Sequence, residues 1–386
     1  MIILLDENIP MAEHYFSEFV QSGVDGKAQG ELRFKAGREI CAEDVTDVDA
    51  LIVRSVSQVN EALLANSPVR FVGSCTIGMD HIDTEYLDKR GIAYANAPAC
   101  NANSVVEYVF AALSHLGCDW QGKRLGIIGM GNVGSALYRR ASELGVECCG
   151  FDPLIEQDRY PVLCSLDEVL SCDIVSMHAP LSHSGPAPSY QMIGEAEIAQ
   201  LRSGSVLLNC GRGDCLDNRA LLDRLKSKAD LFTVLDVWQD EPNIHADLLP
   251  FVNIATPHIA GYSYDGKVKG TQMIAGSLAE HLGQTLTAGK SIVEQVQAIS
   301  DVKGATAFEA LQQLIPHCYD IKADDSRLRA AMKENPNGFA REFDRLRKHY
   351  PKRREFFHFR LANDVLLPEK EKQRLEHSLA ALGFSQ

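Results

Sequence analysis

Residues 122–134 read GKRLGIIGMGNVG, and this stretch decides the fold of the chain. An apolar run typical of a buried strand leads straight into Gly129, Gly131 and Gly134, spaced as G-x-G-x-x-G. In such a motif the first glycine permits a tight turn, the second lets the backbone approach a pyrophosphate, and the third lets a helix pack on its strand. Amide groups at the N-terminus of that helix favour the anion. The stretch therefore predicts a dinucleotide site.

Because a lone glycine motif also occurs in ordinary turns, the residues around it decide whether it indicates a dinucleotide site. Residues 135–144 have helical spacing, and residues 146–151 form a second apolar run that ends in Asp152. An acid about 20 residues beyond the glycines is placed to bind the adenosine ribose hydroxyls. The same carboxylate repels a 2′-phosphate, and no arginine follows it immediately, which favours NAD over NADP. We expect Asn132, Val133 and Asp152 to bind NAD together with the glycines.

Length and composition exclude several classes of protein. The chain has 386 residues, 45% of them hydrophobic, which suits two or three domains with cores of their own. A formal net charge of −14 argues against nonspecific binding to nucleic acid. The N-terminus has no basic leader, and no later segment approaches a membrane span. We therefore expect a cytoplasmic protein that binds neither nucleic acid nor membrane.

The chain contains 11 cysteines, which raises the question of disulfides and metal sites. They are scattered through apolar segments, include the adjacent pair Cys148 and Cys149, and show no C-x-x-C spacing. Zinc sites and dithiol redox sites usually carry such spacing. We therefore expect reduced, mostly buried thiols and no metal.

Short apolar runs alternate with helical or loop segments along most of the chain. Such alternation favours parallel sheets covered by helices. Besides the run in the glycine motif, they lie at 1–5, 50–53, 70–72, 92–94, 146–151, 173–177, 205–209, 232–235 and 252–255. The pattern predicts an α/β fold with two doubly wound, Rossmann-like parallel-sheet domains.

The order of these segments predicts the domain limits. A helical stretch at about 265–286 is expected to return to the N-terminal domain. This gives a discontinuous substrate-binding domain at 1–100 and 259–287, with an NAD-binding Rossmann domain at 101–258 between its parts. From 288 to 386 the strand and helix signals are mixed, and we expect a third, C-terminal α+β domain.

Three polar residues follow predicted strands beyond the glycine motif: Arg212 in NCGRGD, Glu241 in LDVWQDEP and His258 in TPHIAGY. Open α/β sheets bind ligands at the carboxyl ends of their strands. The planar guanidinium of Arg212 suits the carboxylate and C2 oxygen of a hydroxy acid. His258 can take the hydroxyl proton as hydride leaves C2, and Glu241 can orient the imidazole and stabilise its charged form. Each residue alone has an ordinary structural explanation, but their joint occurrence favours catalysis.

With VGSCTIGMDHID at 72–83, these motifs resemble in order and spacing those of the D-isomer-specific 2-hydroxyacid dehydrogenases. The resemblance covers about residues 1–284 and implies an NAD-dependent dehydrogenase that acts on a CH–OH group. It also implies that the loop at 74–78 offers amide groups to the substrate carboxylate. Asp236 resembles the family residue that meets the nicotinamide amide.

Less common features narrow the resemblance to one branch of this family. They are Arg54 and Ser55 after a strand, Thr76 in the 72–83 segment, the SHSGP insertion at 182–186, HIAGYSYDGKVKGT at 258–271 and the basic run EFDRLRKHYPKRREF at 342–356. In that branch 4-phospho-D-erythronate is oxidised to 2-oxo-3-hydroxy-4-phosphobutanoate, a step in the synthesis of pyridoxal phosphate, vitamin B6. The match then covers nearly the whole chain.

This closer resemblance implies further contacts. Substrate contacts are implied for Ser55, Thr76 and Tyr262. NAD contacts are implied for Asp152, Ala179, Asp236 and Gly261. The terminal domain of that branch forms a homodimer. Because the substrate carries a phosphate, we hypothesise that Arg347 or a basic neighbour binds it, from either subunit, with Arg54 on the near side. A basic run is more often a solvated helix face, and that alternative stays open.

Two other functions remain possible. Another hydroxyacid dehydrogenase, such as one for 3-phosphoglycerate, would share the catalytic motifs but is expected to end differently. An NAD-sensing interaction protein can also keep this fold. The complete set of Arg212, Glu241 and His258 counts against that second possibility.

Overall fold

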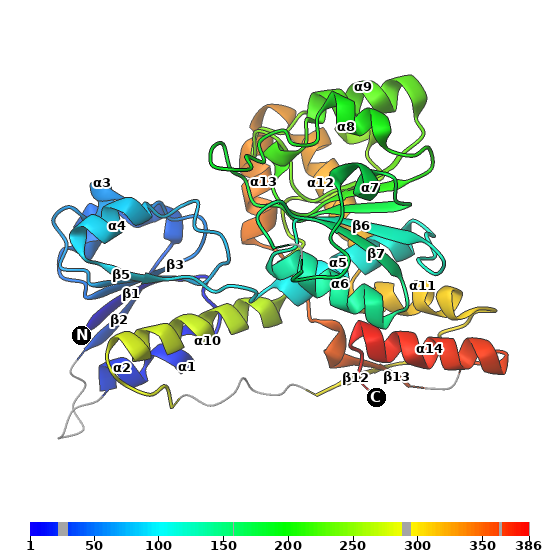
Figure 1. Cartoon of the computed structure of the whole chain (residues 1–386). Coiled ribbons are helices and arrows are strands. Elements are labelled where there is room, and N and C mark those ends of the chain that lie inside the picture. Colours follow the sequence, from blue (N-terminus) through cyan, green and yellow to red (C-terminus); the bar gives the residue numbers. More distant parts are fainter. Residues whose placement is uncertain (22–29, 157, 288–294, 363–364, 386) are drawn as a thin grey trace. The chain divides into compact units, whose positions relative to one another are not determined.

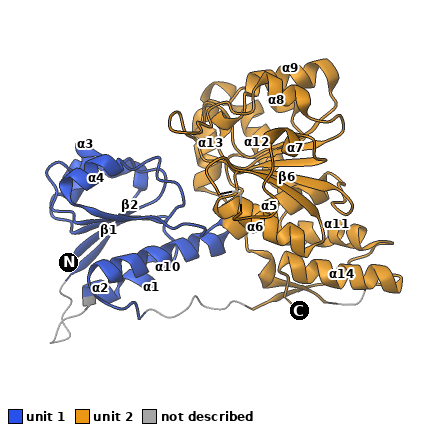
Figure 2. Ribbon diagram, viewed as in Figure 1, with its two compact units in different colours: residues 1–101, 263–293 blue, residues 102–262, 294–386 orange. Residues whose placement is uncertain are grey.

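The computed structural model of the chain describes residues 1–21, 30–156, 158–287, 295–362 and 365–385. They form two compact units (Figure 2). Unit 1 consists of Met1–Asn101 and Ser263–Val293, and unit 2 consists of Ala102–Tyr262 and Glu294–Gln386. Among the described residues, no helix is both long and apolar enough to cross a membrane.

Unit 1 is built on a five-stranded sheet in the order β2-β1-β3-β4-β5, in which every neighbouring pair is parallel (Figure 1). The strands are β1 (Ile2–Asp6), β2 (Glu31–Lys35), β3 (Ala50–Val53), β4 (Phe71–Ser74) and β5 (Ala93–Ala95). The helices are α1 (Ala12–Phe16), α2 (Glu18–Gln21), α3 (Glu61–Leu64), α4 (Thr84–Arg90) and α10 (Tyr264–His281), and the 3-10 turns are η1 (Gly37–Glu39) and η2 (Ala42–Val45).

Helices cover both faces of this sheet. Successive strand residues point to opposite faces. Ile3 therefore packs in one core, together with Ile274 of α10. Its neighbour Leu4 packs in the other core, with Leu64 of α3 and Leu87 of α4. The return of α10 to the N-terminal sheet makes unit 1 discontinuous, while the domain limits 1–100, 259–287 and 101–258 stay a prediction.

Unit 2 contains a six-stranded parallel sheet in the order β11-β10-β9-β8-β6-β7 (Figure 1). Its strands are β6 (Arg124–Ile128), β7 (Glu147–Phe151), β8 (Ile174–Met177), β9 (Val206–Asn209), β10 (Phe232–Leu235) and β11 (Ile254–Ala255). The helices of this part are α5 (Ala102–His115), α6 (Asn132–Glu143), α7 (Leu166–Leu170), α8 (Glu195–Gln200) and α9 (Asn218–Lys228), and the 3-10 turns are η3 (Gly213–Cys215) and η4 (Leu249–Phe251). The chain passes from β7 across β6 to β8, so this sheet is doubly wound.

The C-terminal residues add helices and a small sheet to unit 2. The helices are α11 (Ala307–Cys318), α12 (Ile321–Glu334), α13 (Phe339–Lys348) and α14 (Glu369–Leu382), with the 3-10 turns η5 (Pro336–Gly338) and η6 (Phe356–His358). Strands β12 (Gln297–Ile299) and β13 (Phe359–Leu361) form a parallel pair. Leu314 of α11 shares a core with Val109 of α5, and Phe343 of α13 shares another with Leu235 of β10. The C-terminal segment is thus of mixed α and β structure, as predicted, while its separation as a third domain at 288–386 stays a prediction.

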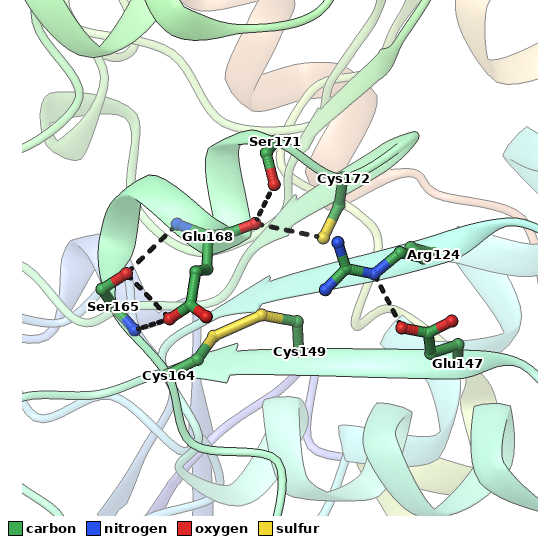
Figure 3. The surroundings of a disulfide bond; sticks show 8 residues. All are labelled: Arg124, Glu147, Cys149, Cys164, Ser165, Glu168, Ser171 and Cys172. Atoms are coloured by element: carbon green, nitrogen blue, oxygen red, sulfur yellow. Dashed lines mark hydrogen bonds and ion pairs between the residues drawn. A yellow bond between two sulfur atoms is a disulfide. The ribbon is translucent and has the colours of Figure 1, made fainter.

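The expectation that all cysteines are reduced is wrong for one pair. Cys149 on β7 and Cys164 form a disulfide (Figure 3). The chain beyond β7 turns back alongside it, because the Cys164 amide donates to the Gly150 carbonyl at 2.8 Å and the Gly150 amide to the Val162 carbonyl at 2.8 Å. This return brings the two Cα atoms to 6.3 Å, within the usual span of a disulfide. The other nine cysteines are not in disulfides.

Candidate active site

The predicted residues of unit 2 gather at one edge of its sheet. Because all six strands are parallel, their carboxyl ends share an edge, where open α/β sheets bind ligands. Each strand there is followed by one predicted residue: β6 by Gly129, β7 by Asp152, β8 by Ala179, β9 by Arg212, β10 by Asp236 and β11 by His258.

Glu241 and His258 form a direct pair at this edge. The imidazole Nδ1 lies 2.7 Å from Glu241 Oε2, and the other carboxylate oxygen accepts the Trp238 amide at 2.8 Å. Burial raises the pKa of the Glu241 carboxyl, but His258, Arg347 and the Trp238 amide lower it more, so it lies below its usual value. An ionised Glu241 accepts the Nδ1 hydrogen, which leaves Nε2 as the ring nitrogen for a substrate hydroxyl.

The backbone around His258 is held by Asp236. His258 has a φ of 57°, in the left-handed region that non-glycine residues rarely adopt. The Asp236 carbonyl accepts the His258 amide at 2.7 Å, and the Asp236 carboxylate accepts the amides of Ile259 at 2.8 Å and Ala260 at 2.9 Å. The Thr256 hydroxyl also donates to this carboxylate, at 2.6 Å. Asp236, which is 2% exposed, therefore fixes the turn that carries the imidazole.

Arg212 lies on a turn packed against the turn of Glu241. Its main-chain carbonyl accepts the Asn209 side-chain amide at 3.1 Å. A Cβ on the next residue, Gly213, would lie 1.8 Å from the Trp238 carbonyl oxygen, so only glycine permits this close approach of the two backbones. Trp238 in turn donates its amide to Glu241. The guanidinium and the carboxylate are thus placed by one backbone contact.

The glycine turn has the geometry that a dinucleotide needs. Gly129 has a φ of 88°, and a Cβ on Gly134 would lie 1.9 Å from the Gly129 carbonyl oxygen, so helix α6 packs closely on its strand. A Cβ on Gly131 would meet no atom within 4 Å, which leaves space at the N-terminus of α6 for a pyrophosphate. Asp152 accepts the amides of Met130 at 2.8 Å and Leu154 at 3.0 Å. A carboxylate has about four acceptor positions, so it can still accept ribose hydroxyls.

The predicted substrate contacts of unit 1 follow two neighbouring strands. Arg54 and Ser55 come directly after β3, and Ser55 is exposed. Thr76 follows β4 and lies within hydrogen-bond distance of Ser74 Oγ, at 2.8 Å, and of the Gly78 carbonyl, at 3.3 Å. The Thr76 hydroxyl therefore stabilises its own loop, as threonine hydroxyls commonly do. Its role toward a substrate stays a prediction.

In the basic C-terminal run, Arg347 is more buried than the basic residues next to it. Arg345 and Lys348 are exposed, and Arg345 pairs with Glu342 at 2.6 Å. The Arg347 side chain is 17% exposed, and its Cζ lies 5.7 Å from the ring centre of Tyr262. Its Nε is buried and has no hydrogen-bond partner among the described residues. One hypothesised phosphate ligand therefore lies beside one predicted substrate contact, within a single chain.

The sequence does not single out Arg353, which lies six residues after Arg347. This side chain is 7% exposed and donates to the Ala260 carbonyl and to Ser104 Oγ. Nothing in the pattern KRRE distinguishes a buried arginine from exposed ones, because burial here depends on how α12 and α13 fold back on the sheet. Its partners come from segments far apart in the sequence.

The chain is similar to known dehydrogenases in sequence and in fold. Residues 100–260 match the family of D-isomer specific 2-hydroxyacid dehydrogenases, NAD binding domain, and residues 293–383 match a domain of unknown function (DUF3410). Among solved structures, an NAD-bound 3-phosphoglycerate dehydrogenase from Entamoeba histolytica has a TM-score of 0.63 at 21% identity, covering 76% of this chain and 99% of that one. At that identity the likeness shows the fold.

Relatives in sequence cover the whole chain. The erythronate-4-phosphate dehydrogenase of Cellvibrio japonicus is 47% identical over 390 residues, with 100% of this chain and 99% of the relative covered. That of Teredinibacter turnerae is 43% identical over 389 residues, with the same coverage. The chain therefore belongs to the erythronate-4-phosphate dehydrogenases, within the D-isomer specific 2-hydroxyacid dehydrogenase family.

Proposed function

We propose that this chain is the NAD-dependent enzyme that oxidises C2 of 4-phospho-D-erythronate to give 2-oxo-3-hydroxy-4-phosphobutanoate, a step of pyridoxal phosphate synthesis. The observation that carries the proposal is the Glu241–His258 pair, 2.7 Å apart, at the same sheet edge as Arg212 and the glycine turn. The full-length identity of 47% to a relative of that name supports the choice of substrate.

In this reaction each residue has one task. Arg212 binds the substrate carboxylate and the C2 oxygen through its fork of N–H groups. His258 Nε2 takes the proton of the C2 hydroxyl, and ionised Glu241 stabilises the imidazolium that forms. NAD supplies the acceptor for the hydride that leaves C2. The electron pair of the broken O–H bond forms the C2 carbonyl, and His258 then releases its proton to water.

The carboxyl edge of the unit 2 sheet would hold NAD. Amides at Gly129, Gly131 and the start of α6 would bind its pyrophosphate. The other residues that we assign to this site are Asn132, Val133, Gly134, Asp152, Ala179, Asp236 and Gly261. Because Asp236 already accepts hydrogen bonds from Thr256 and two backbone amides, we expect it to act on NAD mainly through the turn that it fixes.

Arg347 is our candidate for the substrate phosphate, with Tyr262, Ser55, Thr76 and Arg54 as further contacts. Its buried, unpartnered Nε and its place beside Tyr262 support this assignment. We expect Arg347→Ala to raise the KM for the phosphorylated substrate at least tenfold, because a charge-assisted contact contributes about 1.5–3 kcal/mol. Arg345→Ala, on the exposed side of the same helix, is the matched control. An unchanged KM in Arg347→Ala would refute the assignment.

The substrate is tested by following NADH absorbance with 4-phosphoerythronate, 3-phosphoglycerate and D-lactate in parallel. The proposal requires the highest kcat/KM for 4-phosphoerythronate, and a preference for either of the others would overturn it. Lack of turnover with all three would favour an NAD-sensing role. His258→Ala must lower kcat by about 100-fold or more, the usual contribution of a general base.

A further inference from the structure

We propose that the C-terminal segment, residues 295–362 and 365–385, completes the active site of its own chain by holding residues 258–262, the catalytic turn, with Arg353 as the positioning residue. This goes beyond the family description of residues 293–383 as a domain of unknown function. It rests on the proposed function in one respect, the assignment of His258 as the proton carrier.

The peptide of Ala260 is fixed from two sides. Its amide donates to Asp236 at 2.9 Å, on the side of the nucleotide-binding sheet. Its carbonyl accepts Ser104 Oγ at 2.8 Å and the Arg353 guanidinium from the C-terminal segment. Because Ala260 lies two residues after His258, both groups restrict the same turn. The left-handed backbone of His258 needs such restraint, because that conformation is unfavourable for any residue other than glycine.

Arg353 is itself held rigidly inside the C-terminal segment. Its guanidinium stacks on the ring of Tyr319, with Cζ 4.2 Å from the ring centre. The Tyr319 hydroxyl donates to buried Asp324 at 2.9 Å, and the Tyr350 hydroxyl donates to the same oxygen at 2.7 Å. Tyr350 also meets Tyr262 edge to face, with ring centres 5.9 Å apart. The network therefore contacts residues 258–262 at two points, the Ala260 carbonyl and the Tyr262 ring.

The strand that leads into this turn is held by the same segment. β11 lies at the edge of its sheet, and the Ala255 amide donates to Asp325 of α12 at 2.8 Å. Arg329, one helical turn on, pairs with Asp325 and donates to the carbonyls of Leu249 at 2.8 Å and Val252 at 2.7 Å. Strand β11 and the Ala260 peptide that follows it are thus both bound by C-terminal side chains.

The test compares Arg353→Lys with Arg374→Lys in the full-length protein. Lysine keeps the charge at 353 but lacks the planar guanidinium that stacks on Tyr319 while its Nη2 donates to Ser104 and Ala260. Arg374 is the matched control, because it joins the same segment to Asp119 at 2.9 Å, a residue outside the catalytic turn. We expect Arg353→Lys to lower kcat 10- to 100-fold with the KM for NAD within twofold, and Arg374→Lys to leave kcat unchanged.

Two further measurements distinguish a positioning role of Arg353 from an effect on the stability of the protein alone. Hydrogen exchange of the amides in residues 258–262 should be faster in Arg353→Lys and unchanged in Arg374→Lys. The pH dependence of kcat/KM should shift in the first variant alone. Ser104→Ala, a smaller change at the same carbonyl, decides the matter if Arg353→Lys does not fold, and it should lower kcat about three- to tenfold.

The proposal is overturned if Arg353→Lys and Ser104→Ala keep wild-type kcat, pH profile and exchange rates while losing only thermal stability. Its failure can be told from that of the proposed function. If His258→Ala keeps turnover, the catalytic assignment fails whatever Arg353 does. The exchange measurement needs no substrate, so it reports on the turn even if the assigned substrate is wrong.

Discussion

At the scale of single residues, the catalytic turn combines a strained backbone with saturated hydrogen bonds. His258 keeps a φ of 57° because Asp236 accepts three successive amides around it. A functional residue in a sparsely populated conformation persists only where its surroundings over-determine it. The imidazole is therefore placed by the backbone before a substrate arrives.

Some of these roles could be predicted from the sequence alone, and others could not. Arg212, Glu241 and His258 were identified because each follows a strand and together they supply one reaction. The second task of Asp236, holding the turn, could not be read from its position, because its partners are backbone amides. Burial of Arg353 depends on tertiary packing and left no pattern in the sequence.

Removing the charge of Glu241 should separate its effect on catalysis from its effect on stability. We expect Glu241→Gln to lower kcat by about 10- to 100-fold, because the imidazolium loses its ion partner. Since the pKa of Glu241 is lowered in the folded protein, its ionic contribution to stability is present above the unfolded pKa and is lost as pH falls through the folded value.

Urea unfolding at pH 7 and at a series of pH values below about 4.3 measures this contribution. The wild type should lose more unfolding free energy than Glu241→Gln as the pH falls below about 4.3, the ordinary pKa of a glutamate. Equal losses in the two proteins would contradict the lowered pKa.

At the scale of elements, apolar runs located the buried strands well. The runs at 50–53 and 232–235 coincide with β3 and β10, whose residues are almost all buried. The edge strand β2 has no counterpart among the predicted runs. Its sequence ELRFK is mostly exposed or half-buried and carries three charges, so it lacks the apolar pattern of a central strand.

Because the turns of Arg212 and Glu241 touch at Gly213, a methyl group added there is expected to disturb both. In Gly213→Ala the new Cβ would lie 1.8 Å from the Trp238 carbonyl oxygen, so one backbone must move. We expect kcat/KM to fall at least tenfold and stability to fall by about 1–3 kcal/mol.

The control for this change is Gly276→Ala in helix α10, where a Cβ would meet nothing within 4 Å. That variant should gain about 0.5–1 kcal/mol of stability, since alanine favours the helix over glycine. Steady-state kinetics and urea unfolding of both variants check the prediction. Wild-type kinetics in Gly213→Ala would show that the two turns are placed independently.

The disulfide predicts that the unfolding free energy of the protein depends on reductant. Cys149 and Cys164 are 15 residues apart, and a closed loop of that size is worth about 3 kcal/mol in the chain-entropy account. Dithiothreitol should lower the unfolding free energy of the wild type by roughly that amount and leave Cys164→Ser unchanged. Alkylation and mass spectrometry of the native protein provide the direct check. Labelling of both thiols without reductant would mean that the bond does not form.

At the scale of the whole molecule, we propose that the chain forms a homodimer through its C-terminal segment. In that segment Leu366 is 96% exposed and Phe357 is 44% exposed. A second copy of this chain would cover them.

Sedimentation should therefore give a dimer for the wild type and a lighter species for the double variant Leu366→Asp and Phe357→Asp. Phe251→Asp is the control, because Phe251 is 40% exposed but lies in η4, outside the segment. A dimer that survives the double change would place the interface elsewhere.

The discontinuity of unit 1 has a consequence for the newly made chain. One face of the N-terminal sheet is covered by α10, whose fully buried Ile274 packs with Ile3 and Ile52. The ribosome synthesises this helix only after every strand of the nucleotide-binding sheet. Until α10 is made, only α1 and α2 cover this face of the first five strands, so part of its apolar surface stays exposed in the nascent chain and can bind chaperones.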